Sequence, residues 1–300
     1  MYQQQHKLKF YILISKNVNV LFRHFTCSNH DKNDIHIVIN SLDLDFISEA
    51  EQFCKQRNLE YTITESKGTP GRGKNSVLDI FTQSDNDYAV LIDGDDWLTP
   101  HGVYYYKKCA ELENPPDVLC LTHQLCLQAG EEVDNLLFSF FTDEPISEII
   151  QNCKNPERQL WAGYSYYYVN QKEVMSRVVF LSRRAAKYRF DEDMIIGEDT
   201  EHFLRLKHAH FTGDLVMYQK DDRIPTYIYD QRDPGIMRTN RFITNWVPLL
   251  NDKFKQFKSK GILHREILPN FDLQLEDNYI PDICGFEPPN LEVIINKYIA

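Results

Sequence analysis

The sequence predicts an α/β protein in which a largely parallel sheet is covered by helices on both faces. Two observations support this prediction. Strand-like segments alternate with segments of helical spacing through residues 1–115, an arrangement typical of parallel sheets. In addition, residues 88–92 are all apolar or aromatic, which indicates a strand buried on both faces. With 300 residues, of which 42% are hydrophobic, the chain is long enough to bury a core.

The elements of the first half follow from local signals. Phe46, Ala50 and Phe53 recur at helical spacing, and Thr99 offers an N-cap hydroxyl before Pro100, which suits a first helical turn. We expect a Gly-rich basic loop at residues 66–75. The expected strands are residues 7–15, 35–40, 61–65 and 88–92, and the expected helices are residues 20–25, 46–58, 76–81 and 102–112.

The second half is less regular. Phe203, Leu204 and Leu206 indicate a helix, and strand-like composition occurs at residues 117–128, 178–182, 215–219 and 225–229. We expect one α/β domain and a basic helical C-terminal extension. The domain covers residues 1–235, in halves 1–115 and 116–235, and the extension covers residues 236–300.

Composition excludes several classes of protein. The formal net charge of −11, from 33 basic and 44 acidic residues, argues against a surface that grips nucleic acid all over. No apolar run is long enough to cross a bilayer, and residues 1–9 lack an apolar signal core. The seven cysteines are scattered and form no C-x-x-C pair, which is typical of reduced thiols. We expect a soluble cytoplasmic protein.

Three carboxylates crowd the end of the apolar strand: Asp93, Asp95 and Asp96. Open α/β sheets place their ligands at this end of their strands. Like charges so close repel one another unless a cation compensates, and Mg²⁺ or Mn²⁺ shared with substrate phosphates is the usual solution. A solvated acidic turn is the alternative, which the strand before the motif and the helix cap after it disfavour.

Two further clusters carry chemistry. In the basic loop, Lys67, Arg72 and Lys74 alternate with glycines, so that backbone and cations can approach a diphosphate. In the second half, Glu198 and Asp199 follow Gly197 at a helix start, where the helix dipole favours carboxylates.

The chain resembles the glycosyltransferase family 2 enzymes with the GT-A fold. The strongest matches are YAVLIDGDDWLTP at residues 88–100 and VVFLSRRAAKYRFDEDMIIGEDTEHFLRL at residues 178–206. The segment GRGKN at residues 71–75 is similar to the family's basic segment ending in Asn. The resemblance extends over about residues 10–238. It implies a GT-A fold, with a nucleotide-sugar half (residues 1–115) and an acceptor half (residues 116–235).

The resemblance also implies roles for single residues. Asp199 would be the general base, with Glu198 orienting it or the acceptor. Asp95 and Asp96 would bind the metal, and Asp233 stands where the family often has a histidine ligand. The residues implied in donor binding are Asp93, Lys74, Asn75, Arg72, Asp43, Ser15 and Arg238. The chain departs from the family at residues 40–43 and 15–17, where Asn40, Ser41 or Asp43 could serve the nucleobase.

The implied activity is a metal-dependent, inverting transfer of a sugar from a nucleotide-diphospho-sugar, a UDP-sugar by default, to an acceptor hydroxyl. Mn²⁺ or Mg²⁺ would be the cofactor. Three alternatives stay open: a nucleotidyltransferase of related fold, a phosphatase with a D-x-D nucleophile, and a GT-A module that binds nucleotide sugars or glycans without turnover.

The basic segment at residues 238–265 has two interpretations, one of which concerns the acceptor. It concentrates cations, while apolar residues from Trp246 to Phe257 recur at helical spacing. The favoured interpretation is a helix that packs on the catalytic domain. The alternative is a patch for an anionic acceptor: a phosphorylated glycan, a membrane surface touched peripherally, or a nucleic acid with a hydroxylated base.

Overall fold

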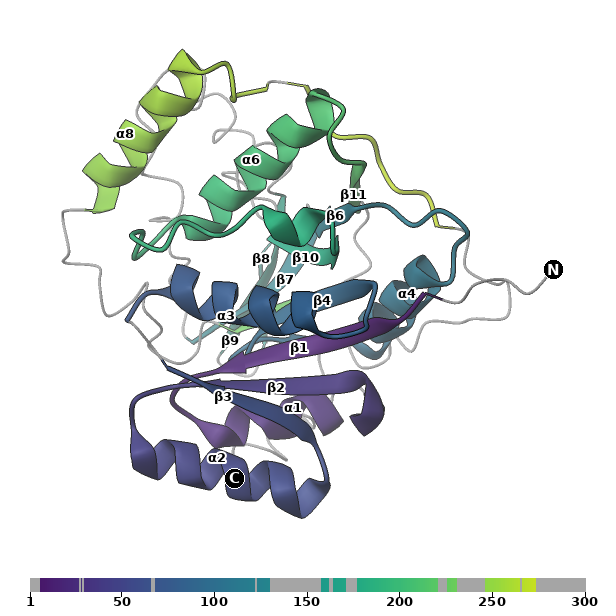
Figure 1. The fold of residues 1–300 in the computed structure, drawn as a ribbon, viewed down its shortest axis with the longest axis vertical. Coiled ribbons are helices and arrows are strands. Elements are labelled where there is room, and N and C mark those ends of the chain that lie inside the picture. Colours follow the sequence, from purple (N-terminus) through teal and green to yellow (C-terminus); the bar gives the residue numbers. More distant parts are fainter. Residues whose placement is uncertain are drawn as a thin grey trace.

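The computed structural model describes most of the chain, and its core is a seven-stranded sheet between two layers of helices (Figure 1). A second sheet of five strands lies beside it. The predicted α/β class with a mostly parallel sheet is confirmed. The described residues are 6–26, 28, 30–65, 68–121, 123–129, 158–161, 164–170, 177–220, 226–230, 246–264 and 266–273.

In the central sheet every neighbouring pair is parallel except the two pairs made by β10, which runs antiparallel to β4 and β6. Strands of residues 1–115 and strands of the second half form one continuous sheet. The order is β11 (Met217–Lys220), β6 (Val118–Leu121), β10 (Arg177–Ser182), β4 (Tyr88–Asp93), β1 (Leu8–Ile14), β2 (Ile35–Asn40) and β3 (Glu60–Thr64).

Alternate residues of β1 point to opposite layers, as the period of a strand requires. Phe10, Ile12 and Ile14 pack with helices α2 (Leu44–Arg57) and α4 (Pro100–Ala110). Tyr11 packs with helices α3 (Pro70–Gln83) and α6 (Glu198–Phe211) on the other face. The described residues also form the short helix α1 (Leu21–Thr26) and the 3₁₀ turns η1 (Val18–Val20), η2 (Lys32–Asp34) and η4 (Ala185–Lys187).

The second sheet joins a segment next to the acidic motif to the late strand β12. Its order is β5 (Trp97–Leu98), β12 (Tyr227–Asp230), β7 (His123–Ala129), β9 (Tyr164–Asn170) and β8 (Arg158–Trp161). The strand predicted at residues 117–128 is thus two strands, β6 and β7, which belong to different sheets. Because β5 follows Asp96 directly, its antiparallel pairing with β12 brings Tyr227 close to the acidic motif.

The loop predicted at residues 66–75 is wrong from Pro70 onward, since α3 begins there. The Thr69 hydroxyl accepts a hydrogen bond from the backbone N–H of Arg72 and caps the helix, and Pro70 occupies its first turn. Glycine serves close packing here: a Cβ on Gly71 would lie 2.3 Å from the carbonyl oxygen of Asp191. Glycine at position 71 was expected to let the backbone approach a ligand, but it lets α3 pack against the loop at Asp191.

Helix α8 (Trp246–Ser259) is the helix that the structure describes in the basic extension, and it lies beside α6 (Figure 1). Phe257 is buried in the same core cluster as α6, and Lys253 forms an ion pair with Asp191. These contacts agree with the favoured interpretation of a packed helix. The predicted boundary at residue 235 lies outside the described residues. In the described part of the chain, no helix has both the length and the apolarity that crossing a bilayer requires.

Candidate active site

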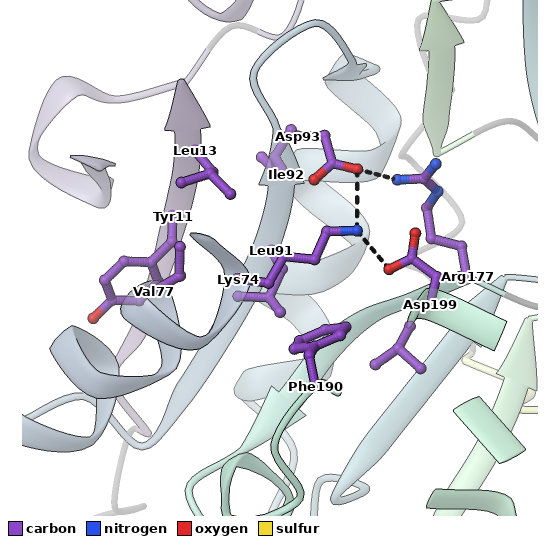
Figure 2. Close-up of a pocket in the computed structure, with 11 residues that line it drawn as sticks. Tyr11, Leu13, Lys74, Val77, Leu91, Ile92, Asp93, Arg177, Phe190 and Asp199 are labelled. Atoms are coloured by element: carbon purple, nitrogen blue, oxygen red, sulfur yellow. Dashed lines mark hydrogen bonds and ion pairs between the residues drawn. The ribbon is translucent and has the colours of Figure 1, made fainter. Parts of the chain in front are cut away.

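A pocket lies at the carboxyl ends of β1 and β4, between α3, the start of β10 and the start of α6 (Figure 2). This is the end of the sheet at which α/β folds bind ligands. Its charged lining residues come from four separate elements. They are Lys74, Asp93, Arg177 and Asp199, with Tyr11, Leu13, Val77, Leu91, Ile92, Val178 and Phe190 completing the wall.

The turn after β4 separates the three carboxylates of the acidic motif. The backbone N–H of Asp96 donates to the carbonyl of Asp93 at 2.9 Å, and that of Gly94 donates to Leu13 at 2.8 Å. A Cβ on Gly94 would lie 2.6 Å from the Leu13 oxygen, so only glycine fits against β1. As a result Asp93 lines the pocket, Asp95 is exposed to solvent, and Asp96 is buried.

Asp96 is held in the interior by two groups from the second half of the chain. The Tyr227 hydroxyl donates to Asp96 Oδ2 at 2.7 Å, and Arg177 Nη1 lies 3.2 Å from the same oxygen. Burial raises the pKa of Asp96 well above its ordinary value, and the Arg177 charge opposes that rise. The carboxylate predicted as a metal ligand thus makes its contacts inside the protein.

Arg177 also faces the pocket. Its Nη1 donates to Asp93 Oδ2 at 2.9 Å and to the Tyr227 hydroxyl at 3.0 Å, and its guanidinium lies 4.7 Å from the centre of the Tyr227 ring. These contacts fix the guanidinium in one position, and they join β10, β4 and β12. One cation therefore serves both the buried and the pocket-facing carboxylate.

The first turn of α6 presents a second pair of acids. Gly197, at the N-cap, has a φ of 84°, a left-handed conformation that favours glycine. Glu198 is buried, with a side chain 8% exposed, whereas the Asp199 side chain is 44% exposed and lines the pocket. Lys74 from α3 stands between them, with Nζ 2.5 Å from Asp199 Oδ1 and 3.0 Å from Glu198 Oε1.

The two acids differ in proton affinity. Burial raises the pKa of Glu198 to about 7, although the Lys74 ammonium opposes the rise. Burial acts in the same direction on Asp199, but there Lys74 and Arg177 outweigh it and hold the pKa below its ordinary value. Asp199 is therefore the acid of this pair that is ionised throughout the neutral range.

The raised pKa of Glu198 predicts a dependence of stability on pH. Between its unfolded pKa of about 4.3 and its folded pKa of about 7, the folded state binds more protons, so stability falls as pH rises, by at most about 1.4 kcal/mol per pH unit. Glu198→Gln, which is neutral at every pH, should lose this fall. Urea unfolding of both proteins at pH 5 and pH 8 measures it; an equal stability difference at both values would contradict the assignment.

The residues predicted to bind the donor are spread over several positions. The Asn75 amide donates to Phe190 O at 3.0 Å and to Glu192 Oε1 at 2.9 Å, and Arg72 Nε lies 3.6 Å from Glu192 Oε2. The Asp43 carboxylate caps α2 by accepting from the backbone N–H groups of Asp45 and Phe46. Ser15 is exposed just after β1. Arg238 lies outside the described residues.

One carboxylate is placed so that it could share a divalent cation with a substrate. Within the described ranges, no group of three or more His, Cys, Asp or Glu side chains is arranged to hold a metal. Mg²⁺ commonly takes only one or two carboxylates and completes its shell with phosphates and water. Asp95 is the outward-facing carboxylate that suits this pattern, while Asp233 falls among residues that the structure does not describe.

Arg177 and Tyr227 were not among the residues predicted for the site. Arg177 is a single cation before an apolar strand, and Tyr227 is an aromatic residue in a short strand; both are common in any sequence. Only the pairing of β10 with β4 and of β12 with β5 brings them to Asp96.

No family model and no curated protein matches the chain. Among solved structures the chain is similar to glycosyltransferases. S. aureus TarS 1–349 in complex with UDP-GlcNAc matches with a TM-score of 0.49 and 13% identity, over 76% of this chain and 60% of that chain. The mannosyltransferase PcManGT from Pyrobaculum calidifontis, in complex with GDP-Man and Mn²⁺, matches with a TM-score of 0.44 and 8% identity, over 85% of this chain and 69% of that one. At these values the matches assign no role to any residue.

Proposed function

We propose that this protein transfers a sugar from a nucleotide-diphospho-sugar to an acceptor hydroxyl. One observation carries the proposal: a single pocket at the carboxyl end of the sheet combines carboxylates from β4 and α6 with two cations, Lys74 and Arg177. Sugar transfer needs both kinds of group. A carboxylate takes the proton from the acceptor, and positive charge balances the departing diphosphate.

The roles divide between the two sides of the pocket. Asp199, on α6, accepts the proton of the acceptor hydroxyl while the acceptor oxygen bonds to the anomeric carbon. The bond from that carbon to the diphosphate breaks, and its electron pair leaves with the phosphate oxygen. Lys74 and Arg177 face that oxygen and stabilise its charge. Asp93, between the two cations, orients them toward the donor.

Mn²⁺ or Mg²⁺ would be held by Asp95 together with the donor phosphates. When bound, the ion supplies further charge compensation for the leaving diphosphate. Asp96 would not bind the ion itself. Its contacts with Tyr227 and Arg177 fix the turn that carries Asp95.

A donor screen tests the function. Thermal shifts are measured with UDP-GlcNAc, GDP-Man and other nucleotide sugars, each with Mn²⁺ and with EDTA, and released nucleoside diphosphate is then assayed. We expect one donor to stabilise the protein and to be hydrolysed slowly or transferred. Binding without any turnover would favour the non-catalytic module, and the absence of binding by every donor would contradict both.

Asp95→Ala should abolish the metal-dependent part of nucleotide binding and leave the fold intact, because Asp95 is exposed and its loss opens no cavity. Calorimetric titration with the nucleoside diphosphate, with and without Mn²⁺, measures the effect. Asp85→Ala is the matched control, since Asp85 is an exposed aspartate before β4, at the strand end opposite the motif. Unchanged metal-dependent binding in Asp95→Ala would refute this assignment.

A further inference from the structure

Lys74 joins the two acidic sides of the pocket. Its Nζ lies 2.5 Å from Asp199 Oδ1, 3.0 Å from Glu198 Oε1 and 3.7 Å from Asp93 Oδ2 (Figure 2 draws the contacts with Asp93 and Asp199). The contacts with Asp199 and Glu198 are hydrogen bonds from the ammonium, whereas the longer contact with Asp93 is an ion pair. The Lys74 side chain is only 12% exposed, and its Nζ lies 5.6 Å from the centre of the Phe190 ring.

The partners of Lys74 differ in how easily they can be exchanged. Glu198 is 8% exposed and lies behind the ammonium, so that separating the two would leave a buried charge alone. Asp199 is 44% exposed and faces the pocket, where water or a ligand can replace the ammonium as its partner. Glu198 is therefore the permanent partner of Lys74, and Asp199 is the replaceable one.

The contact with Lys74 opposes the role proposed for Asp199. A carboxylate that accepts a short hydrogen bond from an ammonium is stabilised as an anion and is a weaker base for an acceptor hydroxyl. A diphosphate entering the pocket changes this balance, because the pocket lining has two carboxylates, Asp93 and Asp199, beside two cations, Lys74 and Arg177. An additional anion attracts these cations away from the carboxylates.

Of the two cations, Lys74 is the one able to move. Arg177 is bound at once to Asp93, Asp96 and Tyr227 and lies against the Tyr227 ring, so its guanidinium has little freedom. Lys74 has a flexible four-carbon stem with rotatable terminal bonds, so its Nζ has more freedom to move than the guanidinium of Arg177.

We propose that Lys74 is a positioning residue that exchanges partners: it binds Asp199 in the donor-free protein and turns to the donor diphosphate when the donor binds, which releases Asp199 to act as base. This inference rests on the proposed function. Glu198 holds the ammonium during the exchange. The protein would then activate an acceptor only when a donor is present, and binding would be ordered, with the donor first.

The protonation of Asp199 reports the exchange directly. In protein labelled with ¹³C at aspartate carboxyls, the Asp199 resonance is identified by its absence in Asp199→Asn and is titrated with and without UDP or GDP, each with Mg²⁺. The charged groups around Asp199 are Lys74 on α3, Arg177 on β10, and Glu198 beside it. In the donor-free protein Lys74→Met should raise the pKa of Asp199 by about 1–3 units, the usual effect of removing an adjacent opposite charge.

A bound nucleotide should raise the pKa of Asp199 in the unmodified protein and have little further effect in Lys74→Met. Lys74→Arg keeps the charge and should retain the donor-free value, and Lys187→Met, at an exposed lysine, is the matched control. Thermal melting confirms that each variant is folded; if Lys74→Met is not, Lys74→Gln replaces it.

The outcomes separate the inference from the function. A bound nucleotide that leaves the Asp199 titration unchanged overturns the exchange alone, and so does an unchanged titration in Lys74→Met. If no nucleotide binds, the proposed function fails together with the exchange, whereas the donor-free comparison still decides whether Lys74 holds Asp199.

Discussion

Asp199→Asn should lower turnover by about 10²–10⁴-fold, the usual weight of general base catalysis. The amide keeps the size of the side chain and can still accept a hydrogen bond from Lys74, but it cannot take a proton. Donor binding should survive, because Lys74 and Arg177, the cations proposed to meet the diphosphate, are both retained. Initial rates of transfer or donor hydrolysis, with calorimetric binding of the nucleotide, measure the two effects separately.

Asp193→Asn is a matched control for this variant. Asp193 is an exposed aspartate in the segment before α6, and its replacement should leave turnover unchanged. If Asp199→Asn turns over normally, the base lies elsewhere, and Glu198, whose pKa is raised to about 7, is the next residue to replace.

Arg177→Met should destabilise the fold by about 3–5 kcal/mol, the typical cost of removing one partner from a buried ion pair. Asp96 has a fully buried carboxylate, and the variant keeps its 2.7 Å hydrogen bond from Tyr227 but loses the cation beside it. The loss should be visible in urea unfolding, as a lower midpoint with an unchanged slope.

The double variant Arg177→Met, Asp96→Asn isolates the cause. An amide at position 96 carries no charge and can still accept from the Tyr227 hydroxyl, so the double variant should recover most of the lost stability. If it is as unstable as Arg177→Met alone, the loss comes from packing on the Tyr227 ring, which lies 4.7 Å from the guanidinium, and the ion pair contributes little.

Several elements were predictable because their signals are local. The apolar run at residues 88–92 and the Thr99–Pro100 cap correspond to β4 and the start of α4, and Phe46, Ala50 and Phe53 lie on the buried face of α2. In each case the side chains that decide the structure are neighbours in the sequence. The mostly parallel class of the central sheet was also predictable, because alternating strands and helices are typical of parallel sheets.

Other features were missed because they depend on contacts between distant segments. Gly71 and Gly73 suggested a loop, yet they lie in α3. A Cβ on Gly71 would lie 2.3 Å from the carbonyl oxygen of Asp191, and one on Gly73 would lie 3.3 Å from the Leu13 side chain, so these glycines allow close packing of the helix. The amide of Asn75 is bonded to Phe190 and Glu192, more than a hundred residues further along the chain.

The sequence by itself determined that acids gather at the end of β4 and at the start of α6, because a strand end and a helix cap are local features. Only the tertiary structure decided that Asp93 and Asp199 face one pocket, that Asp96 turns inward, and that Lys74 and Arg177 stand among them. The physical reason is that an ion pair depends on distance in space. Arg177 and Asp93 are 84 positions apart in the chain, and the antiparallel pairing of β10 with β4 brings them to 2.9 Å.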